Sequence, residues 1–168
     1  SLHPAIHGPL LARLESDEDR IGLAELGYGP ISVVACNLYP FSTAASQEPR
    51  LNDPDLLEMI DIGGPTMVRA SAKNHRNVII VSNPDNYSKV VEELNAAGST
   101  DAVSITFRQQ LALEAFEHTA AYDAAISNEL HSRWIGRPES YAEKSEQEIR
   151  LPETLIESAE KLHTLRYG

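Results

Sequence analysis

Apolar residues in this chain form two short unbroken runs, with segments of helical spacing around and between them. The runs are residues 31–36 and 78–82, and both are rich in β-branched side chains. Such runs are typical of strands that are buried on both faces of a parallel sheet. Since helical segments separate the two runs, the pattern predicts an α/β architecture.

Helical spacing predicts five helices, at residues 16–28, 55–60, 65–73, 87–97 and 104–131. Pro65 suits the first position of the third helix, and Gly98 is expected to end the fourth. The last helix carries an apolar stripe formed by Phe107, Leu111, Ala115, His118, Tyr122 and Ile126. At 1.5 Å per residue it would span about 42 Å, so we expect it to be bent or broken.

Three further segments have a polar or mixed pattern. Residues 42–54 are rich in Ser, Thr, Gln, Asn and Pro and are predicted to form a loop. Residues 134–150 are polar and acidic, which indicates an exposed excursion, and residues 151–155 are predicted to return as a strand. A sheet of two or three strands is thin, since the mean is about five or six. The sequence therefore predicts a sheet from which strands are missing.

Charge and composition limit the possible partners. The 168 residues include 25 acidic and 14 basic side chains, giving a net charge of −11. A protein that binds nucleic acid needs clustered Lys and Arg, so no nucleic-acid partner is expected, although a small phosphorylated ligand is compatible with this charge. The single cysteine, Cys36, excludes an internal disulfide and fits a reducing compartment. No apolar run is long enough to span a membrane, so we expect a cytoplasmic protein with no membrane partner.

Ligands of open α/β sheets bind at the carboxyl ends of strands, which draws attention to the residues that follow each run. Asn37 and Tyr39 follow the first run, and Asn83 and Asp85 follow the second. Tyr39 has two interpretations at this stage: a half-buried ring that covers the end of the sheet, or a catalytic phenol.

A second candidate lies at the start of the helix at 65–73. Asp61 precedes Gly63 and Gly64, so a carboxylate and free backbone N–H groups meet at a helix amino end, where an anion or oxyanion can bind. The favoured alternative is a helix cap with a tight turn. At the other end of this helix, Lys73 opens the polar run 73–76, which is interpreted as a solvated helix end.

Other reactive side chains favour structural interpretations. His3 and His7 have a spacing that suits a metal only within a helix, Pro4 lies between them, and no metal is predicted. His118 is predicted to be a hydrogen-bonded core histidine, and Cys36 a structural residue.

Several short segments occur in an order that is more specific than any one of them. They are 1–4 (SLHP), 7–8 (HG), 35–41 (ACNLYPF), 60–66 (IDIGGPT), 69–70 (RA), 72–75 (AKNH), 115–116 (AF), 118–120 (HTA), 122–123 (YD) and 165–168 (LRYG). Together they resemble the IMP cyclohydrolase domain of the bifunctional purine biosynthesis enzymes, whose other domain is the aminoimidazole carboxamide ribotide (AICAR) transformylase. The resemblance extends over nearly the whole chain.

The resemblance implies a methylglyoxal-synthase-like α/β/α sandwich with a mainly parallel sheet. It also implies dehydrative ring closure of formyl-AICAR to IMP in de novo purine biosynthesis. Tyr39 and Asp61 match family positions for proton transfer, and Lys73 matches a lysine for catalysis and charge stabilisation. The matched substrate-binding positions are Ser1, Asn37, Gly63 and Gly64. Ser1 stands where the family usually has threonine.

The implied reaction involves no redox step, so no cofactor and no metal is expected for ring closure. 10-Formyltetrahydrofolate is expected only for the transformylase domain. The implied partners are the nucleotide formyl-AICAR or IMP, and a second copy of the chain in a homodimer. If residues 65–73 are helical, Asp61 and Lys73 are separated by roughly 14 Å or more along the helix axis. They would then act at different ends of an extended substrate, or Lys73 would reach back.

The family pattern also includes an N-terminal phosphate-binding part with further strands, a lysine directly before the position of Ser1, and the transformylase domain. None of these is found in the 168 residues. We therefore expect residues 1–168 to be the C-terminal part of the cyclohydrolase domain, without its N-terminal strands. The alternative is a nucleotide-binding regulatory module, since the same fold serves that purpose in carbamoyl phosphate synthetase. The set of Tyr39, Asp61 and Lys73 favours the enzyme.

Overall fold

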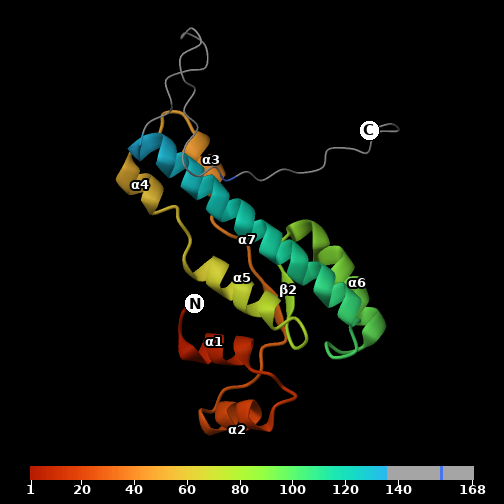
Figure 1. Ribbon diagram of the computed structural model, residues 1–168. Helices are drawn as coiled ribbons and strands as arrows, with labels where there is room; N and C mark the ends of the chain where they lie inside the picture. The colour runs from red at the N-terminus through yellow and green to blue at the C-terminus, as the bar shows by residue number, and fades with distance from the viewer. Residues whose placement is uncertain (136–155, 157–168) are drawn as a thin grey trace, which may run out of the picture.

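The computed structural model describes residues 1–135 and residue 156, and its elements are mostly helices around a small parallel sheet (Figure 1). The helices are α1 (Pro4–Leu11), α2 (Asp17–Glu25), α3 (Phe41–Ser46), α4 (Asp53–Leu57), α5 (Gly63–Lys73), α6 (Tyr87–Ala97) and α7 (Ile105–Trp134). The strands are β1 (Val33–Ala35) and β2 (Ile79–Val81), and a 3₁₀ turn, η1 (Pro84–Asn86), precedes α6. The prediction of α/β architecture is confirmed.

The two strands pair in parallel, with Val33 opposite Ile79 and Ala35 opposite Val81. β2 is buried along its whole length. β1 is not, because Val33 and Ala35 are exposed and only Val34 between them is partly buried. The prediction that residues 31–36 are buried on both faces was therefore wrong. Within the described residues, β1 has a partner on one side only, which leaves its other edge open.

Three apolar clusters hold the helices and the sheet together. The largest lies between the sheet, α5, α6 and α7, and includes Val68, Ile79, Ile80, Val90, Phe107, Leu111 and Ala115. A second cluster joins α3 and α4 to the distal half of α7 through Phe41, Ala44, Leu56 and Tyr122. A third packs Leu10 of α1 against Ala70 and Val78. Leu38 is packed against the first two clusters, so the loop after β1 is held between them.

The longest element is α7, a single helix of 30 residues that passes α5, α6 and α3 (Figure 1). The expected break is not present. The predicted stripe is buried at Phe107, Leu111, Ala115 and Tyr122, but His118 is exposed. The prediction of a core histidine was wrong because this part of the stripe faces an open cavity, described below.

The helices at 16–28 and 87–97 are confirmed as α2 and α6, and Gly98 ends α6 in the left-handed conformation, with φ +73°. The predicted loop at 42–54 was wrong: it contains most of α3 and the start of α4. The helix expected at 55–60 begins two residues earlier, because the side chain of Asn52 caps it by accepting a hydrogen bond from Asp55 N.

The solvated helix end predicted at 73–76 is only partly correct. Lys73 and Arg76 are exposed, but Asn74 is buried. Its amide nitrogen donates hydrogen bonds to Leu10 O at 3.0 Å and Ala12 O at 2.8 Å. Asn74 therefore ties the end of α1 to the end of α5.

The expectations for residues 136–150 and for a strand at 151–155 lie outside the described residues. Within the described part of the chain, no helix has the length and apolar character that a membrane span requires.

Candidate active site at the amino end of α5

Asp61 lies in the connection between α4 and α5, and its carboxylate faces the first turn of α5. Its Oδ1 accepts a hydrogen bond from Gly64 N at 2.8 Å. The N-cap residue itself is Ile62, which makes no side-chain cap bond, so Asp61 one residue earlier pairs one of the N–H groups that a helix leaves free at its start. This agrees with the helix-cap interpretation that the sequence favoured. The bond also places a negative charge where the helix dipole stabilises it. One carboxylate oxygen is thus held in place, and the group has a defined direction.

The glycines of this turn allow the close approach. A Cβ on Gly64 would overlap the Asp61 carboxylate, with Cγ only 2.8 Å away, and would come within 3.0 Å of Leu38. A Cβ on Gly63 would overlap the hydroxyl of Ser1. A side chain at position 64 would therefore displace the Asp61 carboxylate or Leu38, whereas at position 63 only the exposed Ser1 would have to move. The hydroxyl of Ser1 lies against the amino end of α5.

The loop that follows β1 passes beside the same turn. Its residues alternate: Cys36 and Leu38 are partly buried and face α5, while Asn37 and Tyr39 are exposed. The Tyr39 side chain is 54% exposed. About half of the ring is therefore covered, as the structural interpretation proposed, and the other half is accessible to a ligand.

A cavity of about 260 Å³ lies between this loop and α7. Tyr39, Phe41, His118 and Tyr122 are among the residues that line it. This cavity explains the exposure of His118. It also connects Tyr39 to Tyr122, whose hydroxyl contacts the backbone of Asp61.

Tyr122 is the residue that the sequence analysis did not assign to the site. Its hydroxyl oxygen accepts a hydrogen bond from Asp61 N at 2.8 Å, and its O–H donates to Met59 O at 3.3 Å. Burial raises the pKa of the Tyr122 phenol, and this outweighs the opposite effect of the hydrogen bond from Asp61 N. The phenol therefore remains protonated and able to donate. The sequence offered two signals at Tyr122: its place on the apolar stripe of α7, which indicated packing, and the family motif at 122–123, which carried no assigned role.

Lys73 lies away from this cluster. It is the last residue of α5, an 11-residue helix that begins at Gly63, so about 15 Å of helix separates the two ends. The exposed Lys73 side chain extends from the carboxyl end of α5, while Asp61 lies at its amino end. Six of the predicted site residues thus lie at the first turn of α5 or in the loop beside it: Ser1, Asn37, Tyr39, Asp61, Gly63 and Gly64. Lys73 lies at the other end of the helix.

Cys36 contacts the same turn, with Sγ 4.0 Å from Gly64 O. Burial raises the pKa of the Cys36 thiol, and the negative charge of Asp61 raises it further. The thiol is therefore protonated at neutral pH, in agreement with a structural role.

His3 has a structural role at the start of α1 and shares no hydrogen bond with His7 in the described part of the chain. His3 is the N-cap of α1, and its Nδ1 accepts a hydrogen bond from Ala5 N at 3.1 Å. Within residues 1–135 and 156, no group of three or more His, Cys, Asp or Glu side chains has the arrangement of a metal site.

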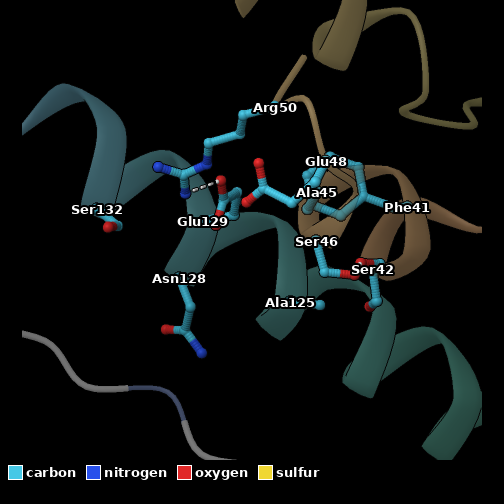
Figure 2. Close-up of a pocket in the computed structure, with 10 residues that line it drawn as sticks. All are labelled: Phe41, Ser42, Ala45, Ser46, Glu48, Arg50, Ala125, Asn128, Glu129 and Ser132. Atoms are coloured by element: carbon cyan, nitrogen blue, oxygen red, sulfur yellow. Dashed lines mark hydrogen bonds and ion pairs between the residues drawn. The ribbon is translucent and has the colours of Figure 1, made fainter. Parts of the chain in front are cut away.

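A larger cavity, of about 830 Å³, lies between α3 and the distal half of α7 (Figure 2). Ser42 and Ser46 line one side, and Asn128 and Glu129 line the other. Two of its charged groups are already paired, because Arg50 binds Glu129 at 2.8 Å. None of the predicted site residues lines this cavity.

These features define a class of protein: a mixed α/β domain whose candidate site joins a strand-end loop to the amino end of a helix. A family model described as the AICARFT/IMPCHase bienzyme matches residues 71–168, which is more than half of the chain. The chain therefore belongs to this family of bifunctional purine biosynthesis enzymes. This confirms the resemblance drawn from the short ordered motifs.

Relatives across the whole chain agree with this assignment. The bifunctional purine biosynthesis protein PurH of Sorangium cellulosum (strain So ce56) is 42% identical over 168 residues. That of Myxococcus xanthus (strain DK1622) is 46% identical over 169 residues, and that of Persephonella marina (strain DSM 14350 / EX-H1) is 44% identical over 168. Each alignment covers 100% of this chain but only 29% or 30% of the relative. The chain thus spans about 30% of the length of the curated relatives it matches.

A solved structure described as the crystal structure of ForH has a similar fold. Its TM-score is 0.67 at 35% sequence identity, and the match covers 77% of this chain and 65% of that chain. The likeness supports the mixed α/β fold with its small parallel sheet.

Proposed function

We propose that this chain belongs to an IMP cyclohydrolase, which closes the second purine ring by dehydrating formyl-AICAR to IMP. The observation that carries the proposal is the fixed carboxylate of Asp61, held by Gly64 N at 2.8 Å next to the loop that presents Tyr39. Membership in the bifunctional purine biosynthesis family supports it. In this proposal residues 1–168 form the C-terminal part of the cyclohydrolase domain, within a methylglyoxal-synthase-like α/β/α sandwich.

The proposed chemistry is an addition followed by loss of water. The carboxamide nitrogen attacks the formyl carbon, so that a C–N bond forms while the formyl C=O bond becomes a C–O single bond. The carboxamide nitrogen gives up a proton and the former formyl oxygen takes one, which makes a hydroxyl. This hydroxyl then takes a second proton and leaves as water, while the former formamide nitrogen loses its proton and the ring C=N bond forms. An amide nitrogen is a weak nucleophile, so holding it against the formyl carbon contributes much of the rate.

In this proposal, residues at different positions transfer protons, contact the substrate and stabilise charge. The Asp61 carboxylate and the Tyr39 phenol exchange protons with the reacting nitrogen and oxygen. Ser1, Asn37 and the turn at Gly63 and Gly64 contact the substrate. Lys73 acts from the carboxyl end of α5, either at the far end of an extended substrate or by reaching back, where its charge stabilises a developing anion.

The proposal extends to cofactors and assembly. Ring closure requires neither cofactor nor metal, and 10-formyltetrahydrofolate serves only the transformylase domain. The working form is a cytoplasmic homodimer in which the N-terminal segment and the transformylase domain of the same protein complete the molecule. Its ligand is the nucleotide, formyl-AICAR or IMP, without nucleic acid or membrane.

The test is a spectroscopic assay of formyl-AICAR conversion, on the 168 residues and on a longer protein that adds the preceding segment. Asp61→Asn and Tyr39→Phe should each lower kcat by roughly a hundredfold or more, since general acid–base groups contribute about that factor. Tyr87→Phe, which removes a phenol from the exposed start of α6, is the matched control and should retain turnover. Tight nucleotide binding without turnover in the longer protein would instead favour the regulatory module.

A further inference from the structure

Tyr122 holds the segment that presents Asp61. The segment is residues 58–62, which connects α4 to α5 and runs alongside α7 (Figure 1). Tyr122 reaches it from the middle of α7, 61 positions further along the sequence than Asp61. One phenol oxygen accepts from Asp61 N at 2.8 Å and donates to Met59 O at 3.3 Å, so it joins two residues of the segment at once.

The carboxylate of Asp61 is held from the opposite side by Gly64 N at 2.8 Å. The Asp61 backbone is therefore fixed by α7, and its side chain is fixed by α5. Both helices are packed in the largest apolar cluster, through Val68 and Ala72 of α5 and Leu111 and Ala115 of α7. The position of the carboxylate is thus set by two rigid elements rather than by a free loop.

Packing alone does not explain a tyrosine at this position. The ring of Tyr122 meets the ring of Phe41 edge to face, with centroids 6.4 Å apart and an interplanar angle of 73°. A phenylalanine would make the same contact. The hydroxyl adds the two bonds to the connecting segment, and without it a part-buried N–H and a part-buried carbonyl would lose their partner.

We propose that Tyr122 is a positioning residue for Asp61: its hydroxyl fixes the 58–62 segment so that the Asp61 carboxylate stays directed at the amino end of α5. The consequence for catalysis rests on the proposed function, in which Asp61 exchanges protons with the substrate. The consequence for the position of the carboxylate does not depend on that function. The two parts can therefore be tested separately.

The structural test follows the amide of Gly64 by NMR in the longer protein, labelled with 15N at glycine. A hydrogen bond to a carboxylate moves an amide proton downfield, so Tyr122→Phe should move the Gly64 amide resonance upfield and speed its hydrogen exchange. Two controls separate this from a general loss of stability: Ile79→Val, which removes one methylene from the buried β2, and Tyr87→Phe. Both should leave the Gly64 resonance at its wild-type position. An unchanged Gly64 resonance in Tyr122→Phe overturns the proposal.

The kinetic test is a double-mutant cycle in the longer, active protein. Tyr122→Phe alone should lower kcat roughly ten- to a hundredfold, because a displaced catalytic group loses about that much, with KM changed by less than about twofold. In an Asp61→Asn background the same substitution should lower kcat by less than about twofold, since its effect passes through Asp61. Equal losses in both backgrounds, or a loss confined to KM, contradict the proposal.

Two further measurements cover the remaining outcomes. If Tyr122→Phe does not fold, the wild-type protein decides: the Asp61 amide should be protected from hydrogen exchange, and exchange at the rate of an open loop overturns the proposal. Replacing Tyr122 by p-aminophenylalanine, which keeps a donor and an acceptor, should restore the Gly64 resonance. If the longer wild-type protein does not convert formyl-AICAR to IMP, the proposed function is wrong. The Gly64 measurement still decides whether Tyr122 positions Asp61.

Discussion

At the scale of single residues, side chains in the loop after β1 alternate between those that pack against the interior and those that a ligand can reach. In the loop after β1, Cys36 and Leu38 face the interior and contact the first turn of α5, while Asn37 and Tyr39 face outward. Successive side chains of extended backbone point to opposite sides, so the inward pair fixes the outward pair. The accessible phenol of Tyr39 is thus held by neighbours that take no part in the chemistry.

Cys36 provides a test of this inward packing. Because burial and the Asp61 charge raise the pKa of its thiol, alkylation by iodoacetamide at pH 8 should be slower in the folded chain than in urea. The folded rate should still be rising at pH 9. Asp61→Asn should accelerate the folded reaction, because it removes a negative charge that disfavours the thiolate. Equal rates in folded and unfolded chains would show that the thiol is neither buried nor close to Asp61.

Lys73 is tested by Lys73→Met in the longer protein. Its match to a family lysine predicts a loss of turnover of at least about tenfold, equivalent to about 1.4 kcal/mol of transition-state stabilisation. Arg76→Met is the matched control, because it removes an exposed cation three residues further along the chain. Turnover within about twofold of wild type, with the fold intact, would leave Lys73 as an ordinary cation at a helix carboxyl end.

The sequence alone led to most of these site residues, but not to how they are held. Asp61, Gly63 and Gly64 stand close together in the sequence, so their turn was predicted as a unit. Tyr122 lies 61 positions from Asp61, and its hydroxyl bond depends on how α7 packs. Periodicity shows which face of a helix is apolar, but it does not show what the end of one buried side chain meets.

At the scale of elements, local signals decided which predictions were correct. α6 has a clear apolar face and a glycine that ends it, and both of its bounds were predicted. α3 has six residues, of which only Phe41 and Ala44 are buried, too few to show a period. β1 was expected to be buried because its residues are apolar, but burial depends on neighbouring strands.

An ion pair at the amino end of α2 is expected to make the folding stability depend on pH. Arg13 binds Asp19 at 3.0 Å and, with other hydrogen bonds to that carboxylate, lowers the pKa of Asp19 to about 2 from its ordinary 3.8. The folded pKa is depressed, so this contribution to stability is present above about pH 4 and is lost as the pH falls toward 2. The free energies of unfolding of wild type and Asp19→Asn, measured in urea, should therefore become more similar as the pH falls from about 4 toward 2.

The control for that experiment is Glu18→Gln, which removes the same charge from the same helical turn. Its free-energy gap to wild type should vary less with pH, because the ion pair of Arg13 with Asp19 remains. A gap for Asp19→Asn that stays constant from pH 5 to pH 2 would contradict the pairing.

At the scale of the whole molecule, the open edge of β1 is the main feature to be tested. Exposed apolar edges promote association, and Val33 is 39% exposed. We predict that the 168 residues alone bind the nucleotide weakly and turn it over poorly. Co-expression of the preceding segment as a separate polypeptide should restore solubility and turnover. The preceding segment is expected to supply two or three charge-assisted hydrogen bonds to the nucleotide phosphate, each worth roughly 1.5–3 kcal/mol. Its addition should therefore raise the nucleotide affinity at least about a hundredfold over that of the 168 residues alone. A monomeric, soluble and fully active chain of 168 residues would refute this.

The length of α7 has a consequence for how the chain loses its structure. The helix is about 45 Å long, and it contributes Phe107, Leu111 and Ala115 to one apolar cluster and Tyr122 to another. Melting the distal half would remove a wall of the second cluster and release the bonds from Tyr122 to the segment before α5. Melting the proximal half would expose β2. The two clusters therefore share one cooperative unit, and thermal unfolding should occur in a single transition across both.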